Sequence, residues 1–320
     1  MIDDLLAEAG ITEDTDLIGG IIASALDLGR DHADRLDLKI TRSAVAEMRD
    51  AFRTFAPFAA VPKVTVFGSA RTLPDDPLYA QTSALAARFA EAGWMVVTGA
   101  GPGVMQAAAE GAGRDHAIGV SIRLPFEPKA NALFDGDAKH VSMKYFFTRK
   151  LMLVKASSGF VCLPGGFGTL DETLELLTLQ ATGKSVPAPI VLLDVPGGTY
   201  WRGFGEFVAR ELREPGYISP GDMDRVLVTD SPEAAMAEIT GFWRNYRSSR
   251  WYDDRLVLTL AAPPTPDERA ALAEQFRDAL LDGRVDATDD GIALRWNPFA
   301  VGELHRLIRA VNALPSAPAA

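Results

Sequence analysis

The sequence is poor in the residues that mark disulfide-bonded and metal-binding proteins. Its one cysteine, Cys162, cannot form a disulfide within the chain, and its apolar neighbours indicate a buried structural thiol. The four histidines are scattered without the short spacing of metal ligands, so we expect no metal site. They are His32, His116, His140 and His305.

Long apolar runs and an excess of basic residues are also missing. No apolar run approaches the roughly 18 residues that span a bilayer, and the start MIDDLLAEAG has acids where a signal peptide has basic residues. Lys and Arg number 32 against 43 Asp and Glu, which gives a net charge of −11. We therefore expect a cytoplasmic protein that binds no membrane and no nucleic acid, whereas a small anionic ligand is compatible with local positive groups.

The remaining composition predicts an α/β protein. A chain of 320 residues that is 48% hydrophobic can bury a large core. Residues 1–60 have helical periodicity and form a helical lead-in in this interpretation. Residues 61–247 alternate strands, glycine loops and helices, the pattern of a Rossmann-like, doubly wound parallel sheet whose ligands lie beyond the strand ends. Residues 251–315 repeat none of these loops and predict a small α+β appendage.

Several element boundaries rest on local patterns alone. Residues 121–139 are polar and contain prolines, so we expect an irregular connection outside the core. Helices are predicted at 143–156 and from Ser231 to about Arg247. The appendage is predicted to contain a strand at 256–260, a helix at 266–281, a strand or hairpin at 285–296 and a helix at 302–314.

The stretch from residue 159 to 172 has the form strand, glycine loop, helix. Its apolar run ends at Pro164, which cannot donate to a strand ladder, and a helix is expected from about Thr169. Glycine serves where the backbone has positive φ or contacts a ligand, and free amides at a helix start bind anions. The loop glycines Gly165, Gly166 and Gly168, with Thr169, are therefore candidate phosphate ligands.

Thr169 and Glu172 also fit an alternative without any ligand. Thr-x-x-Glu is the capping-box pattern, in which both side chains accept hydrogen bonds from amides of the first helical turn. The same pattern recurs at Thr265 and Glu268, where no glycine cluster precedes it. Because a cap does not require three glycines, we favour a phosphate loop with a working carboxylate at Glu172.

A second glycine loop follows the predicted strand 94–98. Gly99, Gly101 and Gly103 give G-x-G-x-G, which matches neither the dinucleotide fingerprint nor a P-loop, so a mononucleotide is better supported than NAD. Close packing of helix on strand would use the same glycines. Gly68 and Ser69, at the end of the first strand, complete the candidate substrate-binding residues at these strand ends.

The helix predicted at 143–156 carries cations among apolar residues. Arg149 and Lys150 are adjacent, with Lys155 following. Arg149 could lie on the surface or point to an anion at the strand ends, and the residues alone leave both open.

Four segments together resemble the Lonely Guy family, nucleoside 5′-monophosphate phosphoribohydrolases often mislabelled lysine decarboxylases. The resemblance covers roughly residues 62–246, and Ala100 and Gln106 differ from the glycines often present in shorter members. The segments are GAGPGVMQAAAEGA (99–112), LPFE (124–127), YFFTRK (145–150) and PGGFGTLDE (164–172).

The resemblance implies roles for particular residues. Arg149 and Glu172 match the family's catalytic pair, and Gly165, Gly166, Gly168 and Thr169 match its phosphate loop, with Lys150 in the upstream Arg-Lys pair. It also implies a homodimer or higher homo-oligomer, and a substrate of the AMP or cytokinin riboside 5′-monophosphate type. We expect no cofactor, because cleavage of an N-glycosidic bond needs only a carboxylate to stabilise the oxocarbenium-like state and orient water.

Two other functions stay open at this point. A non-catalytic nucleotide or molybdenum-cofactor carrier would use the same glycines but not Glu172. The tail could also be a regulatory module that senses a second nucleotide.

Overall fold

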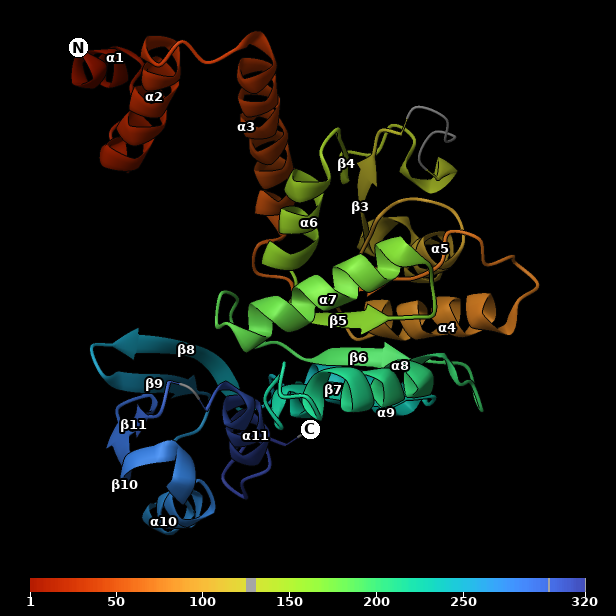
Figure 1. Cartoon of the computed structure of the whole chain (residues 1–320), viewed down its shortest axis with the longest axis vertical. Helices are drawn as coiled ribbons and strands as arrows, with labels where there is room; N and C mark the ends of the chain where they lie inside the picture. The colour runs from red at the N-terminus through yellow and green to blue at the C-terminus, as the bar shows by residue number, and fades with distance from the viewer. Residues whose placement is uncertain (125–130, 299, 320) are drawn as a thin grey trace. The chain divides into compact units, whose positions relative to one another are not determined.

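A computed structural model of the chain describes residues 1–124, 131–298 and 300–319 (Figure 1). Three residues of the LPFE segment, Pro125, Phe126 and Glu127, lie outside this description. The chain divides into two compact units, Met1–Phe52 and Arg53–Ala320. Among the described residues, no helix is both long and apolar enough to span a bilayer.

The first unit is helical, as the periodicity predicts. It contains α1 (Ile2–Glu8), α2 (Thr15–Arg30) and most of α3 (Arg35–Phe55). The side chain of Asp34 accepts hydrogen bonds from the amides of Leu36 and Asp37, which satisfies free donors of the first turn of α3.

The second unit is built on a seven-stranded sheet in the order β4-β3-β2-β1-β5-β6-β7, with all neighbours parallel. The predicted doubly wound α/β fold is confirmed. The strands are β1 (Lys63–Phe67), β2 (Met95–Thr98), β3 (Ala117–Ile122), β4 (His140–Met143), β5 (Gly159–Cys162), β6 (Ile190–Leu193) and β7 (Val226–Thr229). The helices are α4 (Pro77–Glu91), α5 (Val104–His116), α6 (Phe146–Lys155), α7 (Phe167–Ala181), α8 (Tyr200–Val208) and α9 (Pro232–Gly241).

Alternate residues of β1 assign the helices to two faces of the sheet. Val64 and Val66 join a buried cluster with side chains of α4, α5 and α9. Thr65 points the other way, because successive strand residues face opposite sides, and its hydroxyl donates to the Leu153 carbonyl of α6 at 2.7 Å. Thr173 of α7 bonds the Cys162 thiol on this second face. The two helices that carry Arg149 and Glu172 thus cover the same face.

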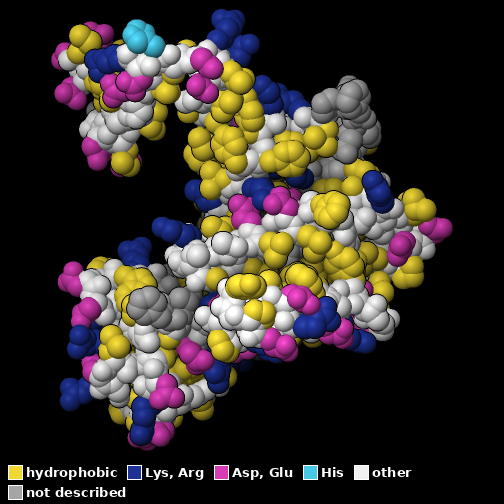
Figure 2. Space-filling model, viewed as in Figure 1, with side chains coloured by type: hydrophobic (Ala, Val, Ile, Leu, Met, Phe, Trp, Pro, Cys, Tyr) yellow, Lys and Arg dark blue, Asp and Glu magenta, His cyan; other side chains and the backbone are white. Residues whose placement is uncertain are grey.

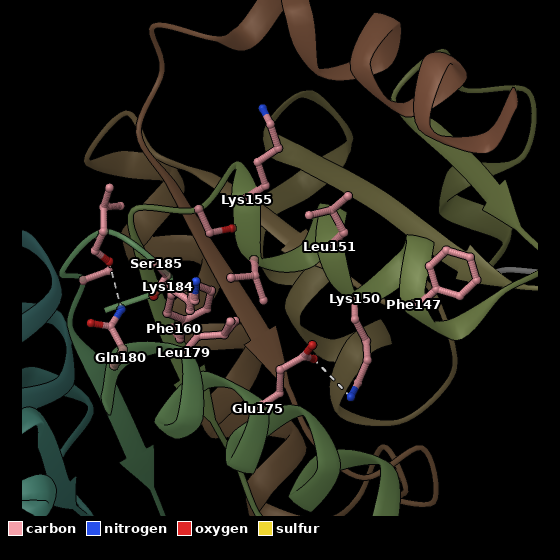
Figure 3. Close-up of a pocket in the computed structure, with 14 residues that line it drawn as sticks. Phe147, Lys150, Leu151, Lys155, Phe160, Glu175, Leu179, Gln180, Lys184 and Ser185 are labelled. Atoms are coloured by element: carbon pink, nitrogen blue, oxygen red, sulfur yellow. Dashed lines mark hydrogen bonds and ion pairs between the residues drawn. The ribbon is translucent and has the colours of Figure 1, made fainter. Parts of the chain in front are cut away.

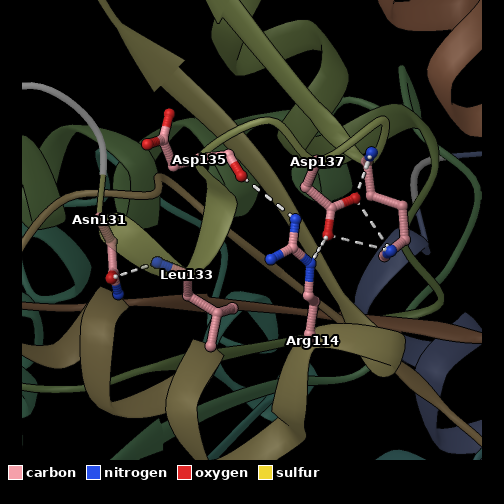
Figure 4. A network of polar contacts seen from close by, with 6 residues as sticks. Arg114, Asn131, Leu133, Asp135 and Asp137 are labelled. Atoms are coloured by element: carbon pink, nitrogen blue, oxygen red, sulfur yellow. Dashed lines mark hydrogen bonds and ion pairs between the residues drawn. The ribbon is translucent and has the colours of Figure 1, made fainter.

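The prediction that residues 121–139 form an irregular connection outside the core is partly wrong. The strand β4 follows this connection directly, and within the connection Phe134 is buried because it fills the space beside Gly119 and Ala100. A polar network ties the connection to α5 (Figure 4): Arg114 pairs with Asp137 at 2.9 Å. The polar composition of this segment gave no sign that Phe134 packs in the core.

The appendage is an antiparallel sheet in the order β10-β11-β9-β8 with α10 and α11. Its predicted strand, helix, hairpin and helix are confirmed. The helix expected to reach Arg247 ends at Gly241, and the helix expected to reach Leu281 ends at Gln275, because both stretches continue as paired strands. The elements are β8 (Tyr246–Tyr252), β9 (Arg255–Leu260), α10 (Pro266–Gln275), β10 (Leu280–Thr288), β11 (Gly291–Trp296) and α11 (Val301–Asn312).

Polar contacts fasten α11 of the appendage to the parallel-sheet domain. Arg309 pairs with Glu238 of α9 at 2.6 Å. The Asn312 side chain donates to the carbonyl of Phe242, which directly follows α9, and it also accepts the amide of Tyr246 within the appendage. All of these contacts lie within the second unit, so the appendage is part of the body that carries the glycine loops.

Candidate active site

The loops that follow β1, β2 and β5 meet at one edge of the sheet. These strands are adjacent and parallel, so their carboxyl ends lie together. The Ser69 amide donates to the Pro164 carbonyl at 3.1 Å, and the Ser69 carbonyl accepts from the Val104 amide at 2.9 Å. The predicted shared edge for the two glycine loops is confirmed.

Some candidate glycines are required by the packing of these loops on one another. A Cβ on Gly68 would lie 2.4 Å from the side chain of Val104. Gly103 has φ +68°, and its Cβ would lie 2.3 Å from the Ser69 carbonyl oxygen. A Cβ on Gly165 would lie 2.2 Å from the hydroxyl of Thr169. Loop packing, left open as an alternative for the second loop, accounts for these positions.

Two glycines of the second loop make room for side chains. A Cβ on Gly99 would lie 2.0 Å from Nη2 of Arg149, and one on Gly101 would lie 2.7 Å from Cε of Met105. Since Arg149 Nη2 also donates to the Gly99 carbonyl at 3.4 Å, the missing side chain lets the guanidinium rest on this loop.

Gly166 and Gly168 differ, because an added Cβ would meet nothing within 4 Å at either position. Both lie at the start of α7, which begins at Phe167 with Gly166 as its N-cap and has no side-chain cap. First-turn amides of a helix have no intrahelical partner, so this end of α7 offers N–H groups and a positive dipole to an anion.

The capping-box alternative for Thr169 and Glu172 is wrong. The helix starts two residues before Thr169, which places Thr169 in the first turn and Glu172 beyond reach of the N-cap amide. Thr169 is buried, and its carbonyl accepts from the Thr173 hydroxyl at 2.7 Å. Glu172 is therefore available for other contacts.

Arg149 lies in the interior, so the surface alternative is also wrong. Its side chain is 9% exposed, its Nε donates to the Val120 carbonyl at 2.9 Å, and Nη1 is 3.5 Å from Oε1 of Glu172. Buried charges are retained when they are paired and hydrogen-bonded. The fold thus brings the two residues of the predicted catalytic pair together from α6 and α7.

Glu172 has an unusual protonation equilibrium for a glutamate. Its side chain is 14% exposed, and burial raises its pKa to about 7. Arg149 and Lys150 pull the pKa down, whereas Asp171 and Glu175 push it up. A carboxylate that titrates near neutral pH at strand ends is typical of catalytic sites.

Lys150 makes contacts that the sequence alone did not indicate. Its ammonium lies 2.8 Å from Asp171 and 3.1 Å from Glu175, both on α7. Lys150 therefore faces the carboxylates on either side of Glu172 in the sequence. These two acids, spaced one helical turn apart, were missed because nothing local in the sequence connects them to α6.

Two further supporting residues were missed at the strand ends. The Tyr200 hydroxyl donates to the Gly165 carbonyl at 2.7 Å, which holds the phosphate loop from outside. Asp194, directly after β6, accepts the Tyr200 amide at 2.8 Å and so fixes the start of α8. An aspartate at the carboxyl end of a buried strand was the signal that could have drawn attention to this position.

The described residues near the strand ends suggest neither metal chemistry nor thiol chemistry. Among residues 1–124, 131–298 and 300–319, no group of three His, Cys, Asp or Glu side chains is placed to hold a metal ion. Cys162 is a free, buried thiol whose pKa burial raises to about 12, as the prediction of a structural thiol requires. The arrangement offers carboxylate, guanidinium and amide chemistry.

Solved structures with a similar fold include a molybdenum cofactor binding protein and a molybdenum cofactor carrier protein. The molybdenum cofactor binding protein of Rippkaea orientalis is 21% identical, with a TM-score of 0.40 over 56% of this chain and 96% of that protein. The molybdenum cofactor carrier protein of Chlamydomonas reinhardtii is 20% identical, with a TM-score of 0.39 and the same coverage. At these values the likeness concerns the fold alone.

The comparisons of sequence identify the family, which the comparisons of fold do not. Residues 103–239 match the family described as possible lysine decarboxylase. A cytokinin riboside 5′-monophosphate phosphoribohydrolase of Mycobacterium marinum is 33% identical over 154 residues, which are 48% of this chain and 80% of that enzyme. One of Arabidopsis thaliana is 33% identical over 122 residues, but the match spans only 54% of its length. On the extent of these matches, the chain belongs to the Lonely Guy family.

Proposed function

We propose that the protein hydrolyses the N-glycosidic bond of a nucleoside 5′-monophosphate, of the AMP or cytokinin riboside type, to a free base and ribose 5-phosphate. The observation that carries this proposal is the buried Glu172 carboxylate, paired with Arg149 beside the open, glycine-lined start of α7. The names of the relatives support the same reaction.

The chemistry assigns one task to each group. As the bond between C1′ and the base nitrogen breaks, its electron pair leaves with the base and positive charge develops at C1′. Ionised Glu172 stabilises that charge and orients the water that attacks C1′, and the water proton passes to the solvent or the base. Arg149 holds the carboxylate in place, and no bound cofactor takes part in these steps.

The 5′-phosphate is assigned to the amides of the loop and the first turn of α7. Gly166 and Gly168 leave open space there, and a helix N-terminus favours a dianion. Lys150 already faces Asp171 and Glu175, so the loop amides supply most of the phosphate contacts in this proposal. Phosphate binding energy then fixes the ribose against Glu172.

The proposal is tested by incubating purified protein with AMP, a cytokinin riboside 5′-monophosphate and adenosine, and separating the products by chromatography. Both monophosphates should release base and ribose 5-phosphate, whereas adenosine should be a poor substrate because a hydroxymethyl group gains little from the loop amides. Equal turnover of AMP and adenosine would contradict the phosphate assignment. Nucleotide binding without turnover of any substrate would favour a carrier.

We also propose a homodimer or higher homo-oligomer that uses the outer surface of α6. Phe146, Phe147 and Leu151 are 55%, 56% and 43% exposed, and hydrophobic side chains lie on the surface in this region (Figure 2). Neighbouring apolar residues of this size usually mark an interaction surface. Light scattering of the wild type should give at least a dimer mass, and Phe146→Glu should shift it toward the monomer; a monomeric wild type at micromolar concentration would contradict this.

A further inference from the structure

The loop that joins β1 to α4 lies between the two glycine loops, because β1 lies between β2 and β5 in the sheet. Its residue Ser69 bonds both neighbouring loops, and a Cβ on Gly165 would lie 2.9 Å from the Ser69 amide nitrogen. The Ser69 hydroxyl accepts the amide of Arg71 at 3.0 Å. A turn of this kind fixes the backbone that follows the serine, so Arg71 is held next to the phosphate loop.

The two cations that act on Glu172 are already engaged. Arg149 is buried and lies 3.5 Å from Glu172. Lys150 pairs with Asp171 and Glu175, and Figure 3 shows its ammonium directed at Glu175. Two cations thus face three carboxylates. A phosphate at the start of α7 would add up to about two negative charges to this group, and its binding would gain from a further cation.

Arg71 can supply that charge. It is exposed, and no carboxylate pairs with its guanidinium among the residues that the structure describes. The acids near the end of the same loop leave it available: Asp76 caps α4 by accepting the Leu78 amide at 2.8 Å, and Asp75 makes no ion pair with it in the described chain. A solvated arginine of this kind adds little to stability, so the fold itself gives no reason for the cation at this position.

The start of α7 is open to a group from the neighbouring loop. Phe167, the first residue of the helix, is 92% exposed, and an added Cβ on Gly166 or Gly168 would meet nothing within 4 Å. An anion bound to the first amides of α7 therefore keeps a side that faces solvent. A guanidinium presents its donors in a planar fork that matches two oxygens of a phosphate.

We propose that Arg71 binds the 5′-phosphate of the substrate from the solvent side of the phosphate loop and so selects nucleotides over nucleosides. This assignment rests on the proposed function and adds a residue to its phosphate site. The loop amides and the helix dipole hold one side of the phosphate, and the guanidinium holds the other. A contact with the phosphate alone is equally strong before and during bond cleavage, so it lowers KM and leaves kcat unchanged.

Calorimetric titration of the full chain with ribose 5-phosphate tests the contact without any turnover. The affinity should fall by at least about tenfold in Arg71→Ala and by less in Arg71→Lys, which keeps the charge but loses the fork. Arg250→Ala is the matched control, because Arg250 is an exposed arginine of β8 without a carboxylate partner in the described chain. Its affinity should equal that of the wild type. All three variants should melt as the wild type does.

Two further measurements separate a phosphate ligand from a residue that only shapes the loop. Adenosine has no phosphate, so its affinity should be the same in Arg71→Ala and in the wild type. For AMP, KM should rise in Arg71→Ala by about the factor lost for ribose 5-phosphate, with kcat unchanged. An equal loss of affinity for adenosine, or a fall in kcat without a change in KM, would overturn the assignment.

The outcomes also separate this assignment from the proposed function. Equal affinity of wild type and Arg71→Ala for ribose 5-phosphate, or no binding to the wild type, would overturn the role of Arg71. The predicted pattern of affinities in a protein that hydrolyses no nucleotide would keep Arg71 as a phosphate ligand and remove only the hydrolase. Hydrolysis of AMP by Arg71→Ala with the KM of the wild type would keep the hydrolase and remove Arg71 from its site.

Discussion

The sequence contains the pattern Thr-x-x-Glu twice, and the two copies have different structures. At Thr265 and Glu268 it is a complete capping box: the Thr265 hydroxyl accepts the Glu268 amide, and the Glu268 carboxylate accepts the Thr265 amide at 2.8 Å. At Thr169 and Glu172 the helix has already begun, and Glu172 faces Arg149 instead. The same four-residue pattern, identical except for Leu170 against Pro266, therefore specifies a cap in one place and a candidate catalytic acid in the other.

The protonation of the two glutamates differs in the same way. Hydrogen bonds from the backbone of Thr265 lower the pKa of Glu268 to about 2. Burial raises the pKa of Glu172 to about 7. The difference teaches that the surroundings of the helix start decide the role of the carboxylate: exposed amides stabilise its charge at one site, whereas strand ends and a covering helix withdraw it from water at the other.

The largest predicted effect is the loss of turnover in Glu172→Gln. The amide keeps the shape but cannot stabilise charge at C1′, so AMP hydrolysis should fall by roughly 10² to 10⁴ with little change in nucleotide affinity. The matched change Glu268→Gln should leave turnover as in the wild type. Equal activity of Glu172→Gln and wild type would remove the catalytic role.

The same variant should change stability in a pH-dependent way. The folded-state pKa of Glu172 is raised from its usual 4.5 to about 7, so its contribution to stability is present below about 4.5 and is lost as pH rises through 7. Glutamine cannot ionise and should keep that stability, so Glu172→Gln should melt above the wild type at pH 8 and close to it at pH 5. A lower melting temperature at pH 8 would contradict the burial argument.

The next effect tests how the second loop positions Arg149. In Gly99→Ala the new Cβ would lie 2.0 Å from Nη2 of Arg149, so the guanidinium must leave its present position on this loop. We expect turnover to fall by about 10 to 10², since misplacing a catalytic group by about an ångström can have such an effect. Arg149→Ala should show a similar loss, and normal turnover in Gly99→Ala would show that this position of Arg149 is not needed.

A smaller effect is expected from Gly166→Ala, which tests the phosphate loop. The added methyl group meets nothing within 4 Å in the protein, so the melting temperature should stay as in the wild type. It would occupy space where the phosphate approaches the first amides of α7, and KM for AMP should rise by about tenfold. An unchanged KM would move the phosphate away from Gly166.

Much of this site could be predicted from the sequence because its signals are local. Pro164 and the following glycines mark the end of a strand and the start of a helix within a few residues. The purpose of individual glycines could not be predicted, because it depends on contacts with other loops: Gly103 accommodates the Ser69 carbonyl, and Gly99 accommodates Arg149. Long-range contacts decide these roles.

The fold shows the same limit. Apart from β4, the parallel strands of the central sheet are apolar runs and were predicted. The strands β4 and β8 lack such runs and were missed. Both are edge strands of their sheets and have exposed residues, so pairing with a neighbour rather than burial defines them. The ion pairs of Lys150 could not be predicted either, because its partners lie on another helix.

The smallest predicted effect concerns the other copy of the pattern. Thr265→Ala removes one cap and should lower the free energy of unfolding by about 1 kcal/mol without changing turnover. Because the folded-state pKa of Glu268 is lowered, its contribution is present above about 4.5 and is lost as pH falls toward 2. Urea unfolding of Glu268→Gln should therefore differ from the wild type at pH 7 and approach it in acid; a loss of AMP hydrolysis in either variant would contradict a purely structural role.

The most direct test of the central claim, that burial converts Glu172 into a carboxylate working near neutral pH, is the pH dependence of kcat/KM for AMP. The ionised form is the active one, so the rate should rise about tenfold per pH unit in acid and level off above an apparent pKa of about 7. A rate that is constant from pH 5.5 to 8.5, the range over which a glutamate of ordinary pKa stays ionised, would contradict the account.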